Sequence, residues 1–157
     1  MFYLVDPSDR RRYLDFSGCG NTINCNHPIV TRFIVNCLEW WVERMGVDGF
    51  RFDLASVFVR GENGEPIANP PLPWNIELSR TLVRLPLIAE AWDPRGLYHV
   101  GTFPGLSWTE WNGRYRDGIR RFVRGTTDEP DLHVILNMAD APVEEPLPVI
   151  PGKNGFR

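Results

Sequence analysis

The sequence predicts an α/β fold in which parallel strands alternate with helices. Two observations lead to this prediction. A long helix-spaced apolar pattern between residues 28 and 45 runs directly into a β-favouring segment, VDGFRFDLA at 47–55. A second helical pattern at 74–84 is followed in the same way by an apolar run, PLIAEAW at 86–92. Helix, strand, helix, strand is the order expected of parallel βα units.

The segment before the first helix is predicted to be a long ordered loop. Residues 1–27 mix Pro, Asp, Gly and Asn with little periodicity, and such residues favour turns. The helix that follows carries clear boundary signals. Asn26 and His27 suit its cap, Pro28 suits its first turn, and Gly46 is expected to end it.

The later elements are predicted from the same signals. Residues 60–73 are polar and rich in Gly and Pro, so they form a loop between the first strand and the helix at 74–84. A third helix is expected at 113–124, with an apolar face and Gly125 as its stop. Residues 132–140 fit one more strand, and the Pro-rich tail at 141–157 is expected to be extended or poorly ordered.

Composition narrows the class of protein. With 43% hydrophobic and 24% charged residues, the chain can build a core, and its net charge of −3 argues against a nucleic-acid partner. No stretch approaches the ~20 apolar residues of a membrane span, and the start lacks a signal-peptide pattern. We therefore expect no membrane partner and a cytoplasmic location. The three cysteines lack the paired spacing of a zinc site, so we expect reduced thiols, no metal and no cofactor.

Two acidic residues stand where the predicted strands end. Asp53 closes GFRFD, and Glu90 lies in IAEAWD. In a parallel α/β barrel the carboxyl ends of the strands face the active-site mouth. Neighbouring strands are ~4.8 Å apart, and retaining hydrolysis of a glycosidic bond uses two carboxyl groups ~5 Å apart, one as nucleophile and one as proton donor. The two positions therefore fit a glycosidase.

Arg51 strengthens this interpretation. Strand alternation places it on the same side as Asp53, where a cation favours the ionised form that a nucleophile needs. Simpler interpretations exist for each residue. Asp53 could cap a helix or close a turn, Glu90 could be a solvated strand end, and Arg51 could form an ordinary salt bridge.

The strings around these residues resemble the alpha-amylase superfamily of glycoside hydrolases. GVDGFRFDLAS is similar to the stretch that supplies the nucleophile and a preceding Arg, and IAEAWD is similar to the stretch that supplies the general acid. The resemblance implies that Asp53 is the nucleophile, Arg51 its charge partner and Glu90 the general acid/base.

Other strings narrow the resemblance to one branch. DFSGCGNTINCNHP, WDPRGLYHVGTFP and EWNGRYRDGIRRFVRG resemble isoamylase-type bacterial glycogen debranching enzymes, almost continuously over residues 3–125. The resemblance implies hydrolysis of α-1,6 branch linkages, with glycogen or branched α-glucan oligosaccharides as partners. It also suggests substrate-binding residues, namely Asn21, Asn26, His27, Trp92, Trp108 and Trp111. Helix capping by Asn26 and His27, and core packing by at least one of these Trp residues, are the simpler alternatives.

The sequence also departs from the superfamily pattern. The Asn-His stretch expected before the first helix and the later His-Asp stretch with a third catalytic carboxylate are both missing. A full barrel takes ~250 residues. The fold is therefore expected to be an incomplete (β/α)8 TIM-barrel fragment, with residues 1–125 as a partial catalytic barrel and 126–157 as a remnant of a C-terminal β domain.

This departure bears on activity. We expect a truncated chain that is weakly active or inactive, and we find no clear ligand set for the calcium that many relatives use. One alternative is a non-catalytic glucan-binding or vestigial protein. Another is an α-1,4-glucan hydrolase of the same superfamily.

Overall fold

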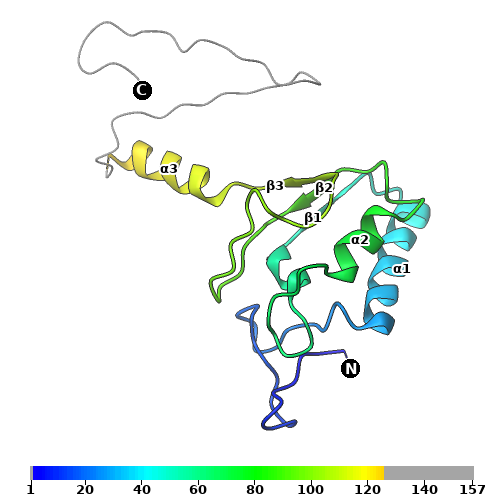
Figure 1. Cartoon of the computed structure of the whole chain (residues 1–157). Coiled ribbons are helices and arrows are strands. Elements are labelled where there is room, and N and C mark those ends of the chain that lie inside the picture. Colours follow the sequence, from blue (N-terminus) through cyan, green and yellow to red (C-terminus); the bar gives the residue numbers. More distant parts are fainter. Residues whose placement is uncertain (1, 126–157) are drawn as a thin grey trace, which may run out of the picture. The chain divides into compact units, whose positions relative to one another are not determined.

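The computed structural model describes residues 2–125, and these fall into two compact units that divide after Asn112. The first unit holds the elements drawn from blue to yellow-green in Figure 1, namely α1 (Pro28–Met45), β1 (Phe50–Phe52), the 3-10 helix η1 (Ala55–Val59), α2 (Pro71–Glu77), β2 (Leu87–Ala89) and β3 (Trp108–Glu110). The strand predicted at 132–140 and the Pro-rich tail lie outside the described residues. The predicted domain division at residue 125 stays a prediction.

The three strands form one parallel sheet in the order β1-β2-β3. Arg51 is paired with Ile88, and Ile88 is paired with Thr109. The α/β class and the parallel pairing are therefore confirmed, although β1 and β2 are each shorter than predicted. The sequence reasoning missed β3, whose three residues carry no alternating apolar pattern.

The first helix has the predicted bounds and the predicted caps. The His27 Nδ1 accepts a hydrogen bond from the backbone N–H of Ile29 at 3.3 Å. At the other end Gly46 has φ 67°, a left-handed conformation that glycine adopts without steric cost, and its N–H donates to the carbonyl of Val42 at 3.1 Å.

The second helix differs from the prediction. It was expected at 74–84 but covers Pro71–Glu77. Prolines at 71 and 73 start it early, because their fixed φ suits a first turn and they need no N–H partner there. It ends at Glu77, and a turn at Ser79 follows. The Ser79 carbonyl accepts from Leu82 N at 3.2 Å, and its hydroxyl donates to Glu39 at 2.7 Å, so these local bonds replace further helix.

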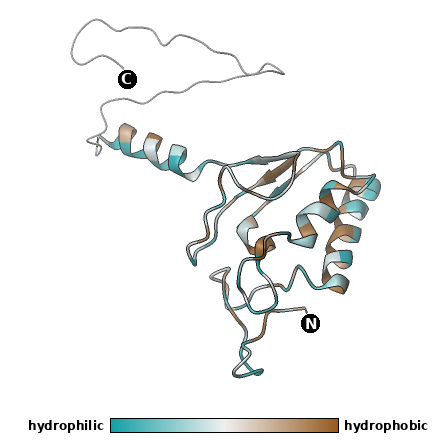
Figure 2. Cartoon of the chain, in the orientation of Figure 1, coloured by the Kyte–Doolittle hydropathy of each residue, from teal (hydrophilic) through white to brown (hydrophobic). Residues whose placement is uncertain are grey.

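The main hydrophobic core lies where α1, α2 and the sheet meet. It contains buried aliphatic side chains from each element together with the Cys25 thiol, whose pKa burial raises to about 12. A smaller cluster lies around Ala89, Ala91 and Phe103, and the Trp108 ring touches both clusters. Figure 2 shows hydrophobic residues along the strands and on parts of α1 and α2.

The second unit is described through α3 (Gly113–Arg124), which matches the predicted helix. Gly125 follows it with φ 66° and donates to the carbonyl of Phe122 at 3.0 Å, as expected of a helix stop. Within residues 2–125, no helix combines the length and apolar character needed to cross a membrane.

Candidate active site

Arg51 joins the two predicted catalytic carboxylates. Its Nη1 lies 2.6 Å from Asp53 Oδ1, and its Nη2 lies 2.9 Å from Glu90 Oε2. One guanidinium therefore spans both carboxyl groups, which places them within reach of a single small ligand. The Asp53 side chain is 71% exposed and that of Glu90 is 12% exposed. The two acids thus occupy different environments although they share one cation.

Parallel pairing explains why these residues meet. Phe52 is opposite Ala89, and the backbone N–H of Glu90 donates to the carbonyl of Phe52 at 3.0 Å. The Ala55 N–H then donates to the Glu90 carbonyl at 2.8 Å. Asp53 and Glu90 each follow the last residue of their strand, and parallel strands end at one edge of the sheet. The local ladder therefore brings the two carboxylates together.

Leu54 stores backbone strain beside this cluster. It has φ 46° and ψ 45°. Within residues 2–125 it is the one non-glycine residue whose φ is positive. Its N–H donates to Glu90 Oε2 at 3.0 Å. A left-handed Leu costs of order 1–3 kcal/mol and is typical of functional sites, where the surrounding structure enforces it. Sequence reasoning gave no signal for this turn.

Trp111 completes the surroundings of Arg51. The guanidinium carbon lies 4.5 Å from the centroid of the Trp111 ring, and Trp111 remains 49% exposed. Its backbone N–H donates to the carbonyl of Ala89 at 2.9 Å, so the end of β2 fixes its position. Of the predicted sugar-stacking residues, Trp111 is the one that the structure places directly on the charged cluster.

A third strand-end carboxylate has a different task. Glu110 ends β3, but its two carboxylate oxygens accept hydrogen bonds from the backbone N–H groups of Gly101 and Phe103. It therefore shapes the loop between β2 and β3. Within EWNG this residue carries no sequence signal of its role, because the three residues of β3 show no strand pattern.

The other two predicted Trp residues lie in contrasting surroundings. Trp92 follows Glu90 by two positions and stacks on Tyr98, with ring centroids 6.2 Å apart and planes 14° apart. Trp108 is partly buried against Phe52 and Phe103, with centroid distances of 5.0 and 5.1 Å. Core packing accounts for Trp108, and sugar binding by either residue stays a prediction.

Among the predicted substrate-binding residues of the loop, Asn26 and His27 have structural roles. The Asn26 amide donates to the carbonyls of Phe58 and Arg60 at 2.7 and 2.8 Å and accepts from Leu72 N at 3.1 Å. His27 caps α1. The structure gives Asn21 one backbone role, because its carbonyl accepts from the Ser17 hydroxyl at 2.6 Å. Substrate contact by these three residues stays a prediction.

A buried ion pair joins the two segments that follow β1 and β2. Arg60 Nη2 and Nε lie 2.6 and 2.9 Å from Asp93 Oδ2, and the two side chains are 6% and 0% exposed. Asp93 Oδ1 also accepts from the backbone N–H groups of Arg95 and Leu97. The pair fastens the segment after β1 to the segment after β2. Neither residue could be assigned this role from sequence, since no local pattern pairs two residues 33 positions apart.

His99 makes a second link between the same segments. Its Nδ1 lies 2.9 Å from the hydroxyl of buried Ser56 in η1, and its backbone N–H donates to the carbonyl of Ala91 at 2.7 Å. Burial lowers the pKa of the His99 imidazole below 6.5, and the charge of Asp93 opposes that effect. Among residues 2–125 no group of three or more His, Cys, Asp or Glu side chains is arranged to hold a metal ion.

Comparison with known proteins gives a consistent picture. No family model matches the chain. The chain is 52% identical over 126 residues to Isoamylase 3, chloroplastic, of Oryza sativa subsp. japonica, covering 80% of this chain and 16% of the relative. It is 43% identical over 123 residues to the glycogen debranching enzyme of Cronobacter sakazakii, covering 77% of this chain and 18% of that enzyme. The solved pullulanase from Bacillus acidopullulyticus matches with a TM-score of 0.56 and 26% identity, over 75% of this chain and 14% of the other.

Fold, site and comparisons agree on one class: over about 80% of its length the chain is similar to a segment of much longer glycoside hydrolases, and its fold is similar to part of a pullulanase. The similar proteins are the isoamylases, a GlgX homologue and glycogen debranching enzymes, at 43–52% identity. The chain spans about one sixth of the length of the curated relatives it matches. The plant relatives are named as chloroplastic, so a cytoplasmic location for this chain stays a prediction.

Proposed function

We propose that this chain carries the catalytic carboxylates of a glycoside hydrolase that cleaves α-1,6 branch linkages in glycogen or a related α-glucan. The observation that carries the proposal is the Arg51 guanidinium in contact with both Asp53 and Glu90 at neighbouring parallel strand ends. The names of the relatives, isoamylase and glycogen debranching enzyme, supply the linkage and the substrate class.

The proposed mechanism is double displacement with retention. An Asp53 oxygen forms a bond to the anomeric carbon while the bond to the branch oxygen breaks, and Glu90 gives that oxygen its proton. Glu90 then takes a proton from water, whose oxygen displaces Asp53 from the anomeric carbon. The 71% exposure of the Asp53 side chain suits attack on a bound sugar. Arg51 contacts both acids and so fixes the position of one relative to the other.

The three strands are proposed to be consecutive strands of a (β/α)8 barrel. In that arrangement the loops after β1, β2 and β3 form one side of the active-site mouth. Trp111, and Trp92 after β2, would offer aromatic faces to pyranose rings. A mouth formed by part of a barrel leaves substrate poorly positioned, and loss of positioning alone can cost ~10²-fold or more in rate. We therefore expect the 157-residue chain alone to turn over glycogen slowly or not at all.

Covalent trapping tests the roles without requiring turnover. A 2-deoxy-2-fluoro maltosyl fluoride should react with the chain when an Asp53 oxygen bonds to the anomeric carbon and fluoride leaves. Peptide mass mapping should then find the glycosyl adduct on the peptide that contains Asp53. Asp53→Asn should abolish the label, whereas Asp48→Asn, an acidic neighbour before β1, should label as the unmodified chain does. A label on another peptide, or an unchanged label in Asp53→Asn, would refute the assignment.

One observation favours a second candidate, a non-catalytic glucan-binding protein. Glu90 Oε2 accepts both from Arg51 and from the Leu54 N–H, so the protein itself already engages this oxygen in a structural role. Under this alternative, Asp53→Asn binds glycogen normally and no adduct ever forms. A third alternative, α-1,4 cleavage, would give short products from linear as well as branched glucan, whereas the proposed enzyme releases only the branches.

A further inference from the structure

We propose that His99 is a positioning residue for the catalytic cluster. While its imidazole is uncharged, its hydrogen bond with Ser56 holds η1 in the place where Asp53 and Glu90 meet. His99 Nδ1 and the Ser56 hydroxyl lie 2.9 Å apart, although 43 positions separate the two residues in the chain. Within residues 2–125 His99 forms no hydrogen bond or ion pair with either catalytic carboxylate, so its effect passes through η1.

Ser56 is tied to Glu90 through the two residues that precede it. The Leu54 N–H donates to Glu90 Oε2 at 3.0 Å, and the Ala55 N–H donates to the Glu90 carbonyl at 2.8 Å. Ala55 and Ser56 are both 0% exposed, so the start of η1 is closely packed and cannot move alone. A shift of Ser56 therefore changes both bonds to Glu90. It also moves Asp53, which directly precedes Leu54.

His99 belongs to a segment that is fastened on both sides of it. Its backbone N–H donates to the carbonyl of Ala91, just after β2, at 2.7 Å. Beyond it, the N–H groups of Gly101 and Phe103 donate to the carboxylate of Glu110 at the end of β3. The backbone thus fixes the imidazole beside η1, and a change in its charge acts directly on the hydroxyl opposite it.

The buried hydroxyl determines the protonation state in which this bond is best made. Among residues 2–125 the Ser56 hydroxyl has His99 Nδ1 as its one hydrogen-bond partner. A neutral imidazole that carries its proton on Nε2 leaves Nδ1 free to accept from that hydroxyl. A charged imidazole carries a proton on Nδ1 as well, so Nδ1 becomes a donor and the Ser56 proton is left without an acceptor in the interior. Protonation of His99 therefore weakens its link to η1.

Charged groups from three segments face the imidazole. Burial has the largest effect and lowers the pKa of His99, the Asp93 carboxylate raises it, the Arg60 guanidinium lowers it, and the Glu110 carboxylate raises it. The net result is a pKa below 6.5, so the imidazole is uncharged at neutral pH. The side chain is half-buried, and protons from water can reach it. The link to η1 is therefore complete above pH 6.5 and is lost as the pH falls through the pKa of the folded state.

The first test rests on the proposed function, because it follows the rate at which the 2-deoxy-2-fluoro maltosyl fluoride labels Asp53 between pH 7.5 and 5.5. Fluoride leaves without a proton, so Glu90 need not be protonated. In the parent the labelling rate should halve at the pH where NMR finds half of the His99 imidazoles charged. His99→Asn keeps an acceptor beside Ser56 and cannot titrate, so at pH 7.5 it should label within about twofold of the parent rate and lose little at pH 5.5. Ser56→Ala should label more slowly than the parent at pH 7.5 and show no dependence on the His99 titration.

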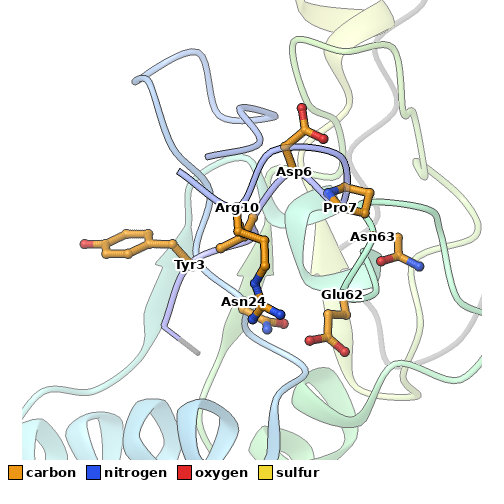
Figure 3. A pocket seen from close by; sticks show the side chains of 8 residues that line it. Tyr3, Asp6, Pro7, Arg10, Asn24, Glu62 and Asn63 are labelled. Carbon is orange, nitrogen blue, oxygen red and sulfur yellow. The ribbon is translucent and has the colours of Figure 1, made fainter. Parts of the chain in front are cut away.

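Glu62→Gln is the matched control, because it also removes one titratable group from the segment after η1. Glu62 is exposed and lines a separate cavity together with Tyr3, Asp6 and Asn24 (Figure 3). It is not among the charged groups that face His99. Its labelling rate and its pH dependence should equal those of the parent.

A second measurement does not depend on the proposed function. The backbone amide resonance of Leu54 reports its bond to Glu90 Oε2, and in the parent it should shift with the same midpoint as the imidazole of His99. The shift should be absent in His99→Asn and in Ser56→Ala. A Leu54 resonance that ignores the titration of His99 overturns the positioning role, whether or not the label forms.

The remaining outcomes separate the two proposals. Equal acid dependence of labelling in the parent, His99→Asn and Ser56→Ala overturns the positioning role and leaves Asp53 as the nucleophile. If no label forms in any of these chains while Leu54 still follows the His99 titration, the catalytic proposal fails and the control of the Glu90 contact by His99 stands.

Discussion

Two arginine–carboxylate clusters lie close along the chain and differ mainly in their exposure to water. Arg60 and Asp93 are 6% and 0% exposed, and every oxygen of the acid has a partner. Arg51 and Asp53 are 33% and 71% exposed, at the open ends of the strands. The buried pair joins the segment after β1 to the segment after β2 and leaves no oxygen of Asp93 for a ligand. The open pair has carboxylate surface left for a substrate, so exposure separates a framework role from a proposed chemical one.

The largest effect is expected from breaking the buried pair. Asp93→Ala leaves the Arg60 guanidinium in the interior without its counter-charge and removes the acceptor for two loop N–H groups. Loss of one partner of a buried pair costs about 3–5 kcal/mol, so the free energy of unfolding in urea should fall by that amount. An Arg60→Met, Asp93→Leu double variant should regain a large part of the loss. A single variant as stable as the parent would show that the pair is not buried in solution.

The open cluster should respond in the opposite way. Arg51→Ala removes an exposed contact with Asp53, which contributes only about 0–1 kcal/mol, and a contact with the 12% exposed Glu90, which keeps the Leu54 N–H as a partner. The unfolding midpoint should therefore fall less than in Asp93→Ala, while the Asp53 adduct forms far more slowly because the nucleophile loses its neighbouring cation. Arg51→Lys should restore part of the rate. Large destabilisation with normal labelling would show that Arg51, like Arg60, mainly stabilises the fold.

The contrast also shows which parts of the site could be predicted from sequence. Arg51, Asp53 and Glu90 were found because strand alternation and strand ends fix where such residues point, and α1 was found because its caps are local signals. Arg60 with Asp93, the hydrogen bonds of Glu110 and the strained Leu54 were not found. Each depends on segments that only the folded sheet brings together, and no nearby residue pattern encodes such pairings. The short α2 was placed wrongly because its prolines outweighed a weak apolar pattern.

The smallest expected effect is a pH dependence at His99, whose ring contacts Ser56. Burial lowers the pKa of its imidazole below 6.5, so below that pH the unfolded chain binds the proton more readily than the folded one. The stability tied to neutral His99 is complete above pH 6.5 and declines as the pH falls through the interval between 6.5 and the folded pKa. His99→Asn keeps a polar group beside Ser56 and cannot titrate. The drop in urea midpoint between pH 7.5 and 5.5 should therefore be smaller in His99→Asn than in the parent. Equal drops would mean that carboxylates alone set the acid sensitivity, and that the link from η1 to the loop after β2 does not depend on the charge of His99.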